Sequence, residues 1–240
     1  MKKKAAGIIM WIIAFIPLII TVILYGSLPE KVPMHFDINW NVDRYGHRSE
    51  LIFACAAYLL MPLLFSVFIR GFERKAAGTE DEKAKAGFMS DVRVVTVIGI
   101  FTSLILTVTF ICILIFMLKT ISNTGSALSY DPTRPIVILM GILLMVIGNF
   151  LPKTRRNSIV GLKCGWTYYN DVTWQKSNRF AALLIMGLGA FTIAMVMIMP
   201  DALIVLFIMM GLMFLIMIVS LVYAYRIYKE EIRKGENQNV

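Results

Sequence analysis

The chain has 240 residues, of which 58% are hydrophobic and only 16% are charged. Soluble domains average about half apolar and about a quarter charged residues, so this excess of apolar residues favours a membrane protein. The formal net charge of +9, in a chain this apolar, indicates a membrane before it indicates nucleic acid. Three widely separated cysteines argue against a secreted disulfide scaffold.

Six stretches free of Lys, Arg, Asp, Glu and His reach or approach the length needed to cross a hydrocarbon core of about 30 Å as helices. They are residues 5–28, 51–69, 94–118, 135–151, 180–199 and 202–225. The first is too long for a cleaved signal peptide and favours an uncleaved anchor, while Pro17 and Pro62 are expected to kink the first two helices. Only Pro200 and Asp201 separate the last two, which predicts a tight helical hairpin. The predicted fold class is an all-α integral membrane protein, a six-helix transmembrane bundle.

Basic residues alternate between the segments that join these spans. The N-terminus, the loops after the second and fourth spans and the C-terminal tail together hold 19 Lys and Arg, whereas the remaining segments hold 5. Cytoplasmic segments of membrane proteins carry the excess of Lys and Arg. The distribution therefore predicts a multi-pass protein of a cell membrane with both termini in the cytoplasm.

The first predicted external loop is the most regular segment. Residues 32–43 alternate apolar and polar side chains, which predicts a short extended, β-like strand with one buried face. Residues 43–46 then resemble a turn. A lone strand needs a partner or a surface to rest on. A cap on the helix ends and a ligand-binding surface both stay open, because periodicity reports burial rather than purpose.

Two of the predicted cytoplasmic loops differ in character. Residues 70–93 are polar and mixed in charge, and we expect a solvated connector in which Thr79 caps a short helix, with Glu82 three residues further on. Residues 152–179 combine six basic residues with four Trp and Tyr. Beside a membrane this composition favours an interfacial segment in contact with anionic lipid over a nucleic-acid site. Asn170 or Asp171 is expected to cap the following helix, on which Trp174 and Asn178 share a face.

The residues offer little catalytic chemistry. No span contains an ionisable residue that would mark an ion-coupled transporter. The histidines and aspartates of the first external loop match no standard metal site. Two cysteines lie in spans and Cys164 has no histidine on its side of the membrane, so a cysteine nucleophile is not indicated. We therefore expect no catalytic, cofactor or metal site, and no enzyme.

Two groups of residues resemble known families. The sequence LPEKVPMHF at residues 28–36, followed by DRYG at 43–46, resembles an LP-x-x-IP-x-HF domain of unknown function at the front of certain bacterial membrane proteins. The second group resembles the signature of the SdpI family, immunity proteins against the SDP killing peptide. It consists of Gly148, Asn149, Lys153, Asn157, Gly161, Leu162, Lys163, Trp166, Thr167 and Trp174. The order of the two groups and the six spans are also those of that family.

The resemblance implies a bacterial immunity or sensor protein that binds a membrane-active toxic peptide and relays its presence to a cytoplasmic transcriptional repressor. The implied partners are the lipid bilayer, an extracellular peptide and that repressor, without direct contact to nucleic acid. Candidate contact residues are Pro29, Pro33, His35, Phe36, Asp43, Asn149, Asn157, Gly161, Lys163, Trp166, Trp174 and Arg179. Alternatives are a transporter or flippase for an amphipathic lipid or peptide, and a membrane enzyme acting on lipid or cell wall.

The resemblance also suggests domain boundaries and shows departures. Residues 1–70 form the front domain, 71–134 a middle segment, and 135–240 the SdpI-like region. Trp40 stands where the front domain usually has Gly, which puts a turn in doubt. Lys163 replaces an Arg, and Cys164 and Gly165 replace a common Thr-Pro pair. Asn178 replaces a His before Arg179, which removes a titrating group.

Overall fold

The computed structural model describes residues 3–122, 131–154, 156 and 160–238. Asn157, one of the candidate contact residues, lies outside the described residues. The elements in chain order are α1 (Lys3–Leu24), η1 (Tyr25–Ser27), β1 (Lys31–Phe36), β2 (Val42–His47), α2 (Glu50–Tyr58), α3 (Leu60–Ala77), α4 (Glu82–Ser122), α5 (Thr133–Phe150), η2 (Leu151–Lys153), α6 (Asp171–Ile198) and α7 (Ala202–Gln238).

The described helices form six segments long and apolar enough to cross a membrane, which confirms the predicted fold class. The second segment is interrupted at Leu59, between α2 and α3. Pro62 lies three residues further on and has no N–H to continue the ladder, so this break agrees with the kink predicted there. By contrast, α1 continues through Pro17.

Three helices extend well beyond the apolar stretches that predicted them. α4 begins at Glu82, α6 at Asp171, and α7 continues to Gln238. The prediction of a solvated connector over residues 70–93 is therefore wrong, because only residues 78–81 lie between α3 and α4. Asp81 rather than Thr79 caps α4, since the Lys83 amide donates to Asp81 Oδ1 at 2.9 Å. Ala, Lys and Glu favour helix as strongly as apolar residues do, and a search for uncharged runs misses that.

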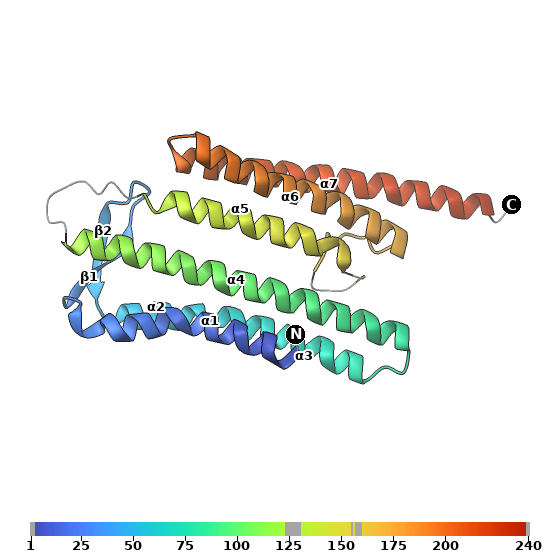
Figure 1. The fold of residues 1–240 in the computed structure, drawn as a ribbon. Coiled ribbons are helices and arrows are strands. Elements are labelled where there is room, and N and C mark those ends of the chain that lie inside the picture. Colours follow the sequence, from blue (N-terminus) through green and yellow to red (C-terminus); the bar gives the residue numbers. More distant parts are fainter. Residues whose placement is uncertain (1–2, 123–130, 155, 157–159, 239–240) are drawn as a thin grey trace.

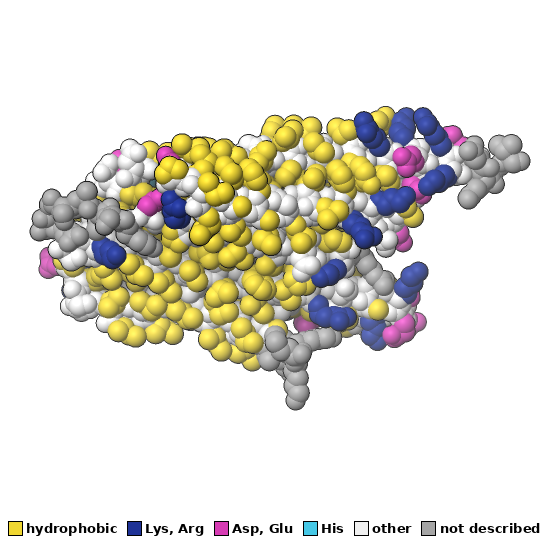
Figure 2. Space-filling view, turned by 45° about the horizontal axis from the view of Figure 1, so that its top comes forward, with side chains coloured by type: hydrophobic (Ala, Val, Ile, Leu, Met, Phe, Trp, Pro, Cys, Tyr) yellow, Lys and Arg dark blue, Asp and Glu magenta, His cyan; other side chains and the backbone are white. Residues whose placement is uncertain are grey.

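The helices lie roughly side by side in one elongated bundle (Figure 1). Within it α5 packs on α6 and α6 on α7, while α4 packs on α1, α3 and, less extensively, α5. One end, here called the hairpin end, carries β1, β2 and the α6–α7 turn. The opposite end, here called the basic end, carries the α3–α4 connection, η2 and the end of α7. Figure 2 shows an apolar middle and a gathering of Lys and Arg at the basic end.

The extended loop is a two-stranded hairpin, not a single strand. β1 pairs antiparallel with β2, with Val32 opposite Gly46 and Phe36 opposite Val42. The segment expected to be a turn, residues 43–46, therefore lies within β2. The true turn forms around Asp37, whose Oδ1 accepts hydrogen bonds from the Asn39 and Asn41 amides, each at 2.8 Å. Asp side chains form such local turns, and hydrophobic periodicity does not detect them.

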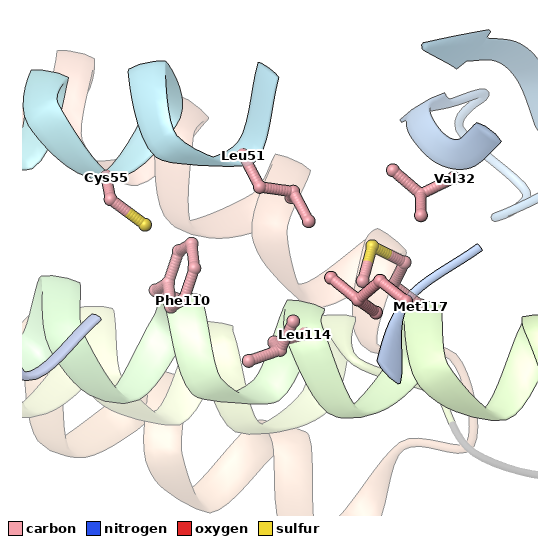
Figure 3. Close-up of a cluster of buried hydrophobic side chains, with 7 residues drawn as sticks. Val32, Leu51, Cys55, Phe110, Leu114 and Met117 are labelled. Atoms are coloured by element: carbon pink, nitrogen blue, oxygen red, sulfur yellow. The ribbon is translucent and has the colours of Figure 1, made fainter. Parts of the chain in front are cut away.

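The hairpin is fixed to the bundle by an apolar cluster. Figure 3 shows Val32 of β1, Leu51 and Cys55 of α2, and Phe110, Leu114 and Met117 of α4 gathered together. Val32 and Cys55 are fully buried. The inward face of β1 thus caps the helix ends. This was one of the two interpretations that the sequence left open, the other being a ligand-binding surface.

Candidate functional site

The hairpin brings two of the candidate residues together. His35 Nδ1 and Asp43 Oδ1 share a hydrogen bond of 2.6 Å between the two strands, and both side chains are exposed. Pro33 is buried beneath them, whereas Pro29 is exposed and precedes β1. Among the described residues, no three His, Cys, Asp or Glu side chains come close enough to hold a metal ion. The pair therefore presents an imidazole and a carboxylate on the outer surface of the hairpin.

A cavity of about 280 Å³ lies between the hairpin and the helices. His35, Phe36 and Trp40 line it on the hairpin side, and Tyr58 and Phe110 line it on the helix side. The Phe36 ring centroid lies 5.8 Å from that of Trp40 and 5.1 Å from that of Phe116. The cavity is therefore lined by aromatic rings, with the exposed imidazole of His35 at its edge.

Trp40 occupies a backbone conformation that explains why the pattern usually has Gly at this position. Its φ is +63°, in the left-handed region that glycine adopts without cost and that other residues adopt at about 1–2 kcal/mol. The indole Nε1 donates to Thr133 Oγ1 at 2.7 Å, and the ring packs on Phe116 with centroids 5.2 Å apart. The turn that Trp40 put in doubt is therefore present, and contacts to α4 and α5 offset its strain.

We expect Trp40→Gly to lower the stability of the purified protein by about 1–3 kcal/mol, because lost packing outweighs relieved strain. Thermal unfolding in detergent measures this. Trp40→Phe keeps an aromatic ring and removes the hydrogen bond, so its loss should be smaller, about 1 kcal/mol. A Trp40→Gly variant as stable as the parent would show that strain dominates.

The hairpin turn should depend on pH through Asp37. Hydrogen bonds from the side chain and backbone of Asn41 lower the pKa of the Asp37 carboxyl. A lowered folded-state pKa means that the stabilisation is present above the unfolded value of about 3.9 and is lost as pH falls through the lowered pKa. We expect the NMR signal of the Asn41 amide to shift in that acidic range. The same titration of Asp37→Asn should be flat, and an equal shift there would contradict the assignment.

The second candidate region is the SdpI-like loop, defined here as residues 160–170, together with the first turns of α6. Asn170 caps α6 reciprocally with Thr173, as expected: the Thr173 amide donates to Asn170 Oδ1 at 2.7 Å, and the Asn170 amide donates to Thr173 Oγ1 at 3.0 Å. Trp174 and Asn178 follow on one face and are both buried. The loop folds back over this face.

Trp174 and Asn178 hold the loop through hydrogen bonds. Trp174 Nε1 donates to the Thr154 carbonyl at 3.0 Å. Asn178 Oδ1 accepts from the Leu162 amide at 2.6 Å, and its Nδ2 donates to the Trp174 carbonyl at 2.9 Å. An imidazole here would lose its acceptor on protonation, whereas the amide holds the loop at any pH. Asn178 therefore anchors the loop through a side chain that carries no titrating group.

Thr167 and Thr173 complete the anchor. Thr167 Oγ1 accepts from the Cys164 amide at 3.1 Å and donates to the Leu162 carbonyl at 2.8 Å. Thr173 Oγ1 lies 3.2 Å from the Thr167 carbonyl. Both threonines are fully buried. Thr167 was part of the recognised signature, but nothing in the sequence pattern marked Thr173 as more than a helix-start residue.

Other members of the signature lie on the outside of this anchor. Trp166 is exposed and makes an edge contact with the ring of Tyr225 on α7, with centroids 5.0 Å apart. Lys163 and Arg179 are exposed. Asn149 is also exposed, with Lys153 Nζ 3.4 Å from its Oδ1. The structure therefore divides the signature into buried anchors and an exposed basic and aromatic face.

A methionine-lined groove of about 650 Å³ lies beside the loop. Gly161 and Leu162 form part of its wall, and the other described lining residues come from α5, α6, α7 and Leu151 of η2. Its methionines are Met140, Met209, Met210, Met213 and Met217. Flexible thioethers suit adaptable apolar surfaces, so this groove favours apolar contacts over a polar transport path.

Arg134 is a structural residue that the sequence did not reveal. It lies in the first turn of α5, and its Nη1 donates to the Val196 carbonyl at 2.7 Å. Its Nη2 donates to the Met199 and Pro200 carbonyls at 3.2 and 2.8 Å. A cation at a helix C-terminus satisfies orphan carbonyls and complements the helix dipole. In the sequence, Arg134 is only one of the five basic residues of the predicted external segments.

The fold and these two regions define a multi-pass helical membrane protein with a capped hairpin end and an anchored basic end. Comparison with known proteins gives one match that includes the hairpin and one that includes the SdpI-like loop. Residues 12–65 match the domain of unknown function DUF1648, and residues 153–224 match the SdpI/YfhL protein family. The chain is 25% identical over 232 residues to Immunity protein SdpI of Bacillus subtilis (strain 168), covering 96% of this chain and 98% of that protein. The resemblance to the SdpI family is confirmed, and no solved structure matches the chain.

Proposed function

We propose that this protein is a bacterial membrane immunity and sensor protein that binds a membrane-active toxic peptide, works without catalysis, and relays the encounter to a cytoplasmic repressor. The observation that carries the proposal is the similarity to Immunity protein SdpI over nearly the whole length of both chains. The anchored SdpI-like loop supports it, because hydrogen bonds of Thr173, Trp174 and Asn178 join the loop and the residues before it to α6.

The hairpin end is the proposed contact for the peptide. It combines an aromatic cavity with the exposed His35–Asp43 pair. Aromatic side chains with polar tips are the usual anchors of protein interfaces. The basic end is the proposed contact for the repressor, because α7 continues past the apolar span there and the exposed Trp166 rests against it.

Both assignments require the basic end to be cytoplasmic, as the 19-to-5 distribution of Lys and Arg predicts. We expect a fluorescent protein fused after Val240 to fluoresce and alkaline phosphatase fused there to be inactive. Fusions within residues 123–130 should give the opposite pair of results. An active phosphatase at Val240 would show that the C-terminus is external. It would contradict the predicted topology and both proposed contacts.

Survival of a toxin-sensitive strain tests the function. A Bacillus subtilis strain lacking Immunity protein SdpI, but still exposed to the toxic peptide, should survive better when it carries this chain. His35→Ala should reduce survival at unchanged membrane levels, since the hairpin is fixed by β1 and its apolar cluster rather than by His35. Exposed Lys31, on the same hairpin, supplies the control Lys31→Ala. Unchanged survival with the parent chain would count against immunity, and protection unaffected by His35→Ala would move the contact elsewhere.

A further inference from the structure

A second large cleft lies at the basic end, separate from the hairpin cavity and the methionine-lined groove. It measures about 800 Å³, within the range of small-molecule sites. Its walls come from the start of α1, the last turns of α3, residues 89–100 of α4, and the end of α5 with η2. It therefore joins four segments that are distant in the sequence.

The lining of the cleft changes from charged to apolar along its length. Arg93, Lys153 and Glu73 are its charged lining residues. Val97 and Ile100 line it one and two turns further along α4, toward the apolar middle of the bundle. At 1.5 Å per residue, Arg93 and Ile100 lie about 10 Å apart along the helix. The cleft is thus charged toward the end of the bundle and apolar toward its middle, which is the polarity of a phospholipid.

Its two cations are available to a ligand. Within the described residues Arg93 makes no hydrogen bond or ion pair, and its side chain is exposed. Among the described residues, the contacts of Lys153 Nζ are one of 3.4 Å to Asn149 Oδ1 and one to the Phe150 ring, 4.6 Å from its centroid. Among the described lining residues, two cations against the carboxylate of Glu73 leave a net charge of +1. That charge complements one phosphodiester, which carries a single negative charge.

We propose that this cleft binds an anionic phospholipid with one phosphate, such as phosphatidylglycerol. The phosphate lies at Arg93 and Lys153, and an acyl chain follows Val97 and Ile100. Basic pockets between transmembrane helices on the cytoplasmic side are the type of site that holds anionic headgroups. Arg offers the phosphate a paired set of donors, and Lys adds a point charge. The site would tie α1, α3, α4 and α5 together at the basic end.

The test uses the purified full-length chain in a neutral detergent. Dioctanoyl phosphatidylglycerol should bind and raise the unfolding temperature, since a ligand of the folded state stabilises it. Dioctanoyl phosphatidylcholine, which has no net charge, should bind about tenfold more weakly. The double variant Arg93→Gln/Lys153→Gln should lose about tenfold or more in affinity for phosphatidylglycerol, whereas Arg93→Lys/Lys153→Arg should retain most of it.

A matched control separates the site from the general basic surface. Arg74 and Lys75 are exposed at the same end on α3 and do not line the cleft. Arg74→Gln/Lys75→Gln removes the same charge and should leave binding unchanged. Equal loss in both double variants, or equal binding of the two lipids by the parent chain, would overturn the proposal. Stabilisation by soluble glycerol 3-phosphate equal to that by the lipid would make the cleft a site for a soluble anion and would also overturn it.

Discussion

Gly161→Ala is expected to destabilise the protein by about 2–5 kcal/mol and to release the SdpI-like loop from α6. A Cβ at this position would lie 2.5 and 2.6 Å from Cη2 and Cζ2 of the Trp174 ring. The ring cannot retreat, because Trp174 is 1% exposed and its Nε1 is bound to the Thr154 carbonyl. The φ of Gly161 is also +138°, which L side chains rarely adopt. Thermal unfolding in detergent, followed by tryptophan fluorescence, measures both effects.

Gly165→Ala is the matched control for this change. It lies in the same loop, and nothing is found within 4 Å of the Cβ it would carry. We expect its stability to change by no more than about 0.5 kcal/mol. Equal unfolding temperatures for the two variants would show that Gly161 is not the residue that permits the loop to approach Trp174. In the survival assay, Gly161→Ala should also protect less than Gly165→Ala.

Gly189→Ala should be the second damaging change, at about 1–3 kcal/mol, because it separates α5 from α6. A Cβ on Gly189 would lie 2.5 Å from the Gly141 carbonyl oxygen and 2.8 Å from Met145 Cγ. The first of these atoms is backbone, so only a movement of a whole helix relieves the contact. Small residues that allow such close backbone approach drive helix association in membranes. Chemical or thermal unfolding of the purified protein measures the cost.

Gly187→Ala, two residues away on the same helix, should raise the stability slightly or leave it unchanged. Its added methyl group meets nothing within 4 Å, and Ala is a better helix former than Gly by up to about 1 kcal/mol. A similar loss in both variants would mean that helix geometry rather than the α5–α6 contact is being measured. A stable Gly189→Ala variant would mean that the two helices separate without cost.

The hydrophobic pattern predicted the six spans because each requires about 20 residues of uncharged helix, and the structure contains them. It missed the extension of α4 back to Glu82, since charged residues with high helix propensity look like loop to a search for apolar runs. The start of α6 was predicted instead from its capping residues, Asn170 or Asp171. The hairpin was half predicted. The alternation of residues 32–43 indicated one strand, whereas β1 ends at Phe36. The Asp37 turn that reverses the chain depends on side-chain hydrogen bonds, which the alternation does not reveal.

The candidate site was predicted as a set of residues, not as an arrangement. The resemblance selected Gly161 and Trp174, and their contact explains why both are needed. It selected His35 and Asp43, which the hairpin pairs. It did not indicate the role of Arg134. This guanidinium donates to the Val196 carbonyl, 62 residues away at the end of α6, and such a contact depends on tertiary packing. Roles in peptide or repressor contact, and the three domain boundaries, stay predictions.

The unbroken course of α7 has a mechanical consequence. A helix of 37 residues is about 55 Å long, whereas a hydrocarbon core is about 30 Å thick. Residues 226–238, about a third of α7, lie beyond the apolar span 202–225 and project past the hydrocarbon core. No cap, turn or proline interrupts it between Met213 in the groove and Tyr228, whose ring meets Tyr169. Because the helix is continuous, a tilt of a few degrees at the groove would move its far end by about 2–3 Å, and a rotation there would turn the Tyr225 and Tyr228 faces with it.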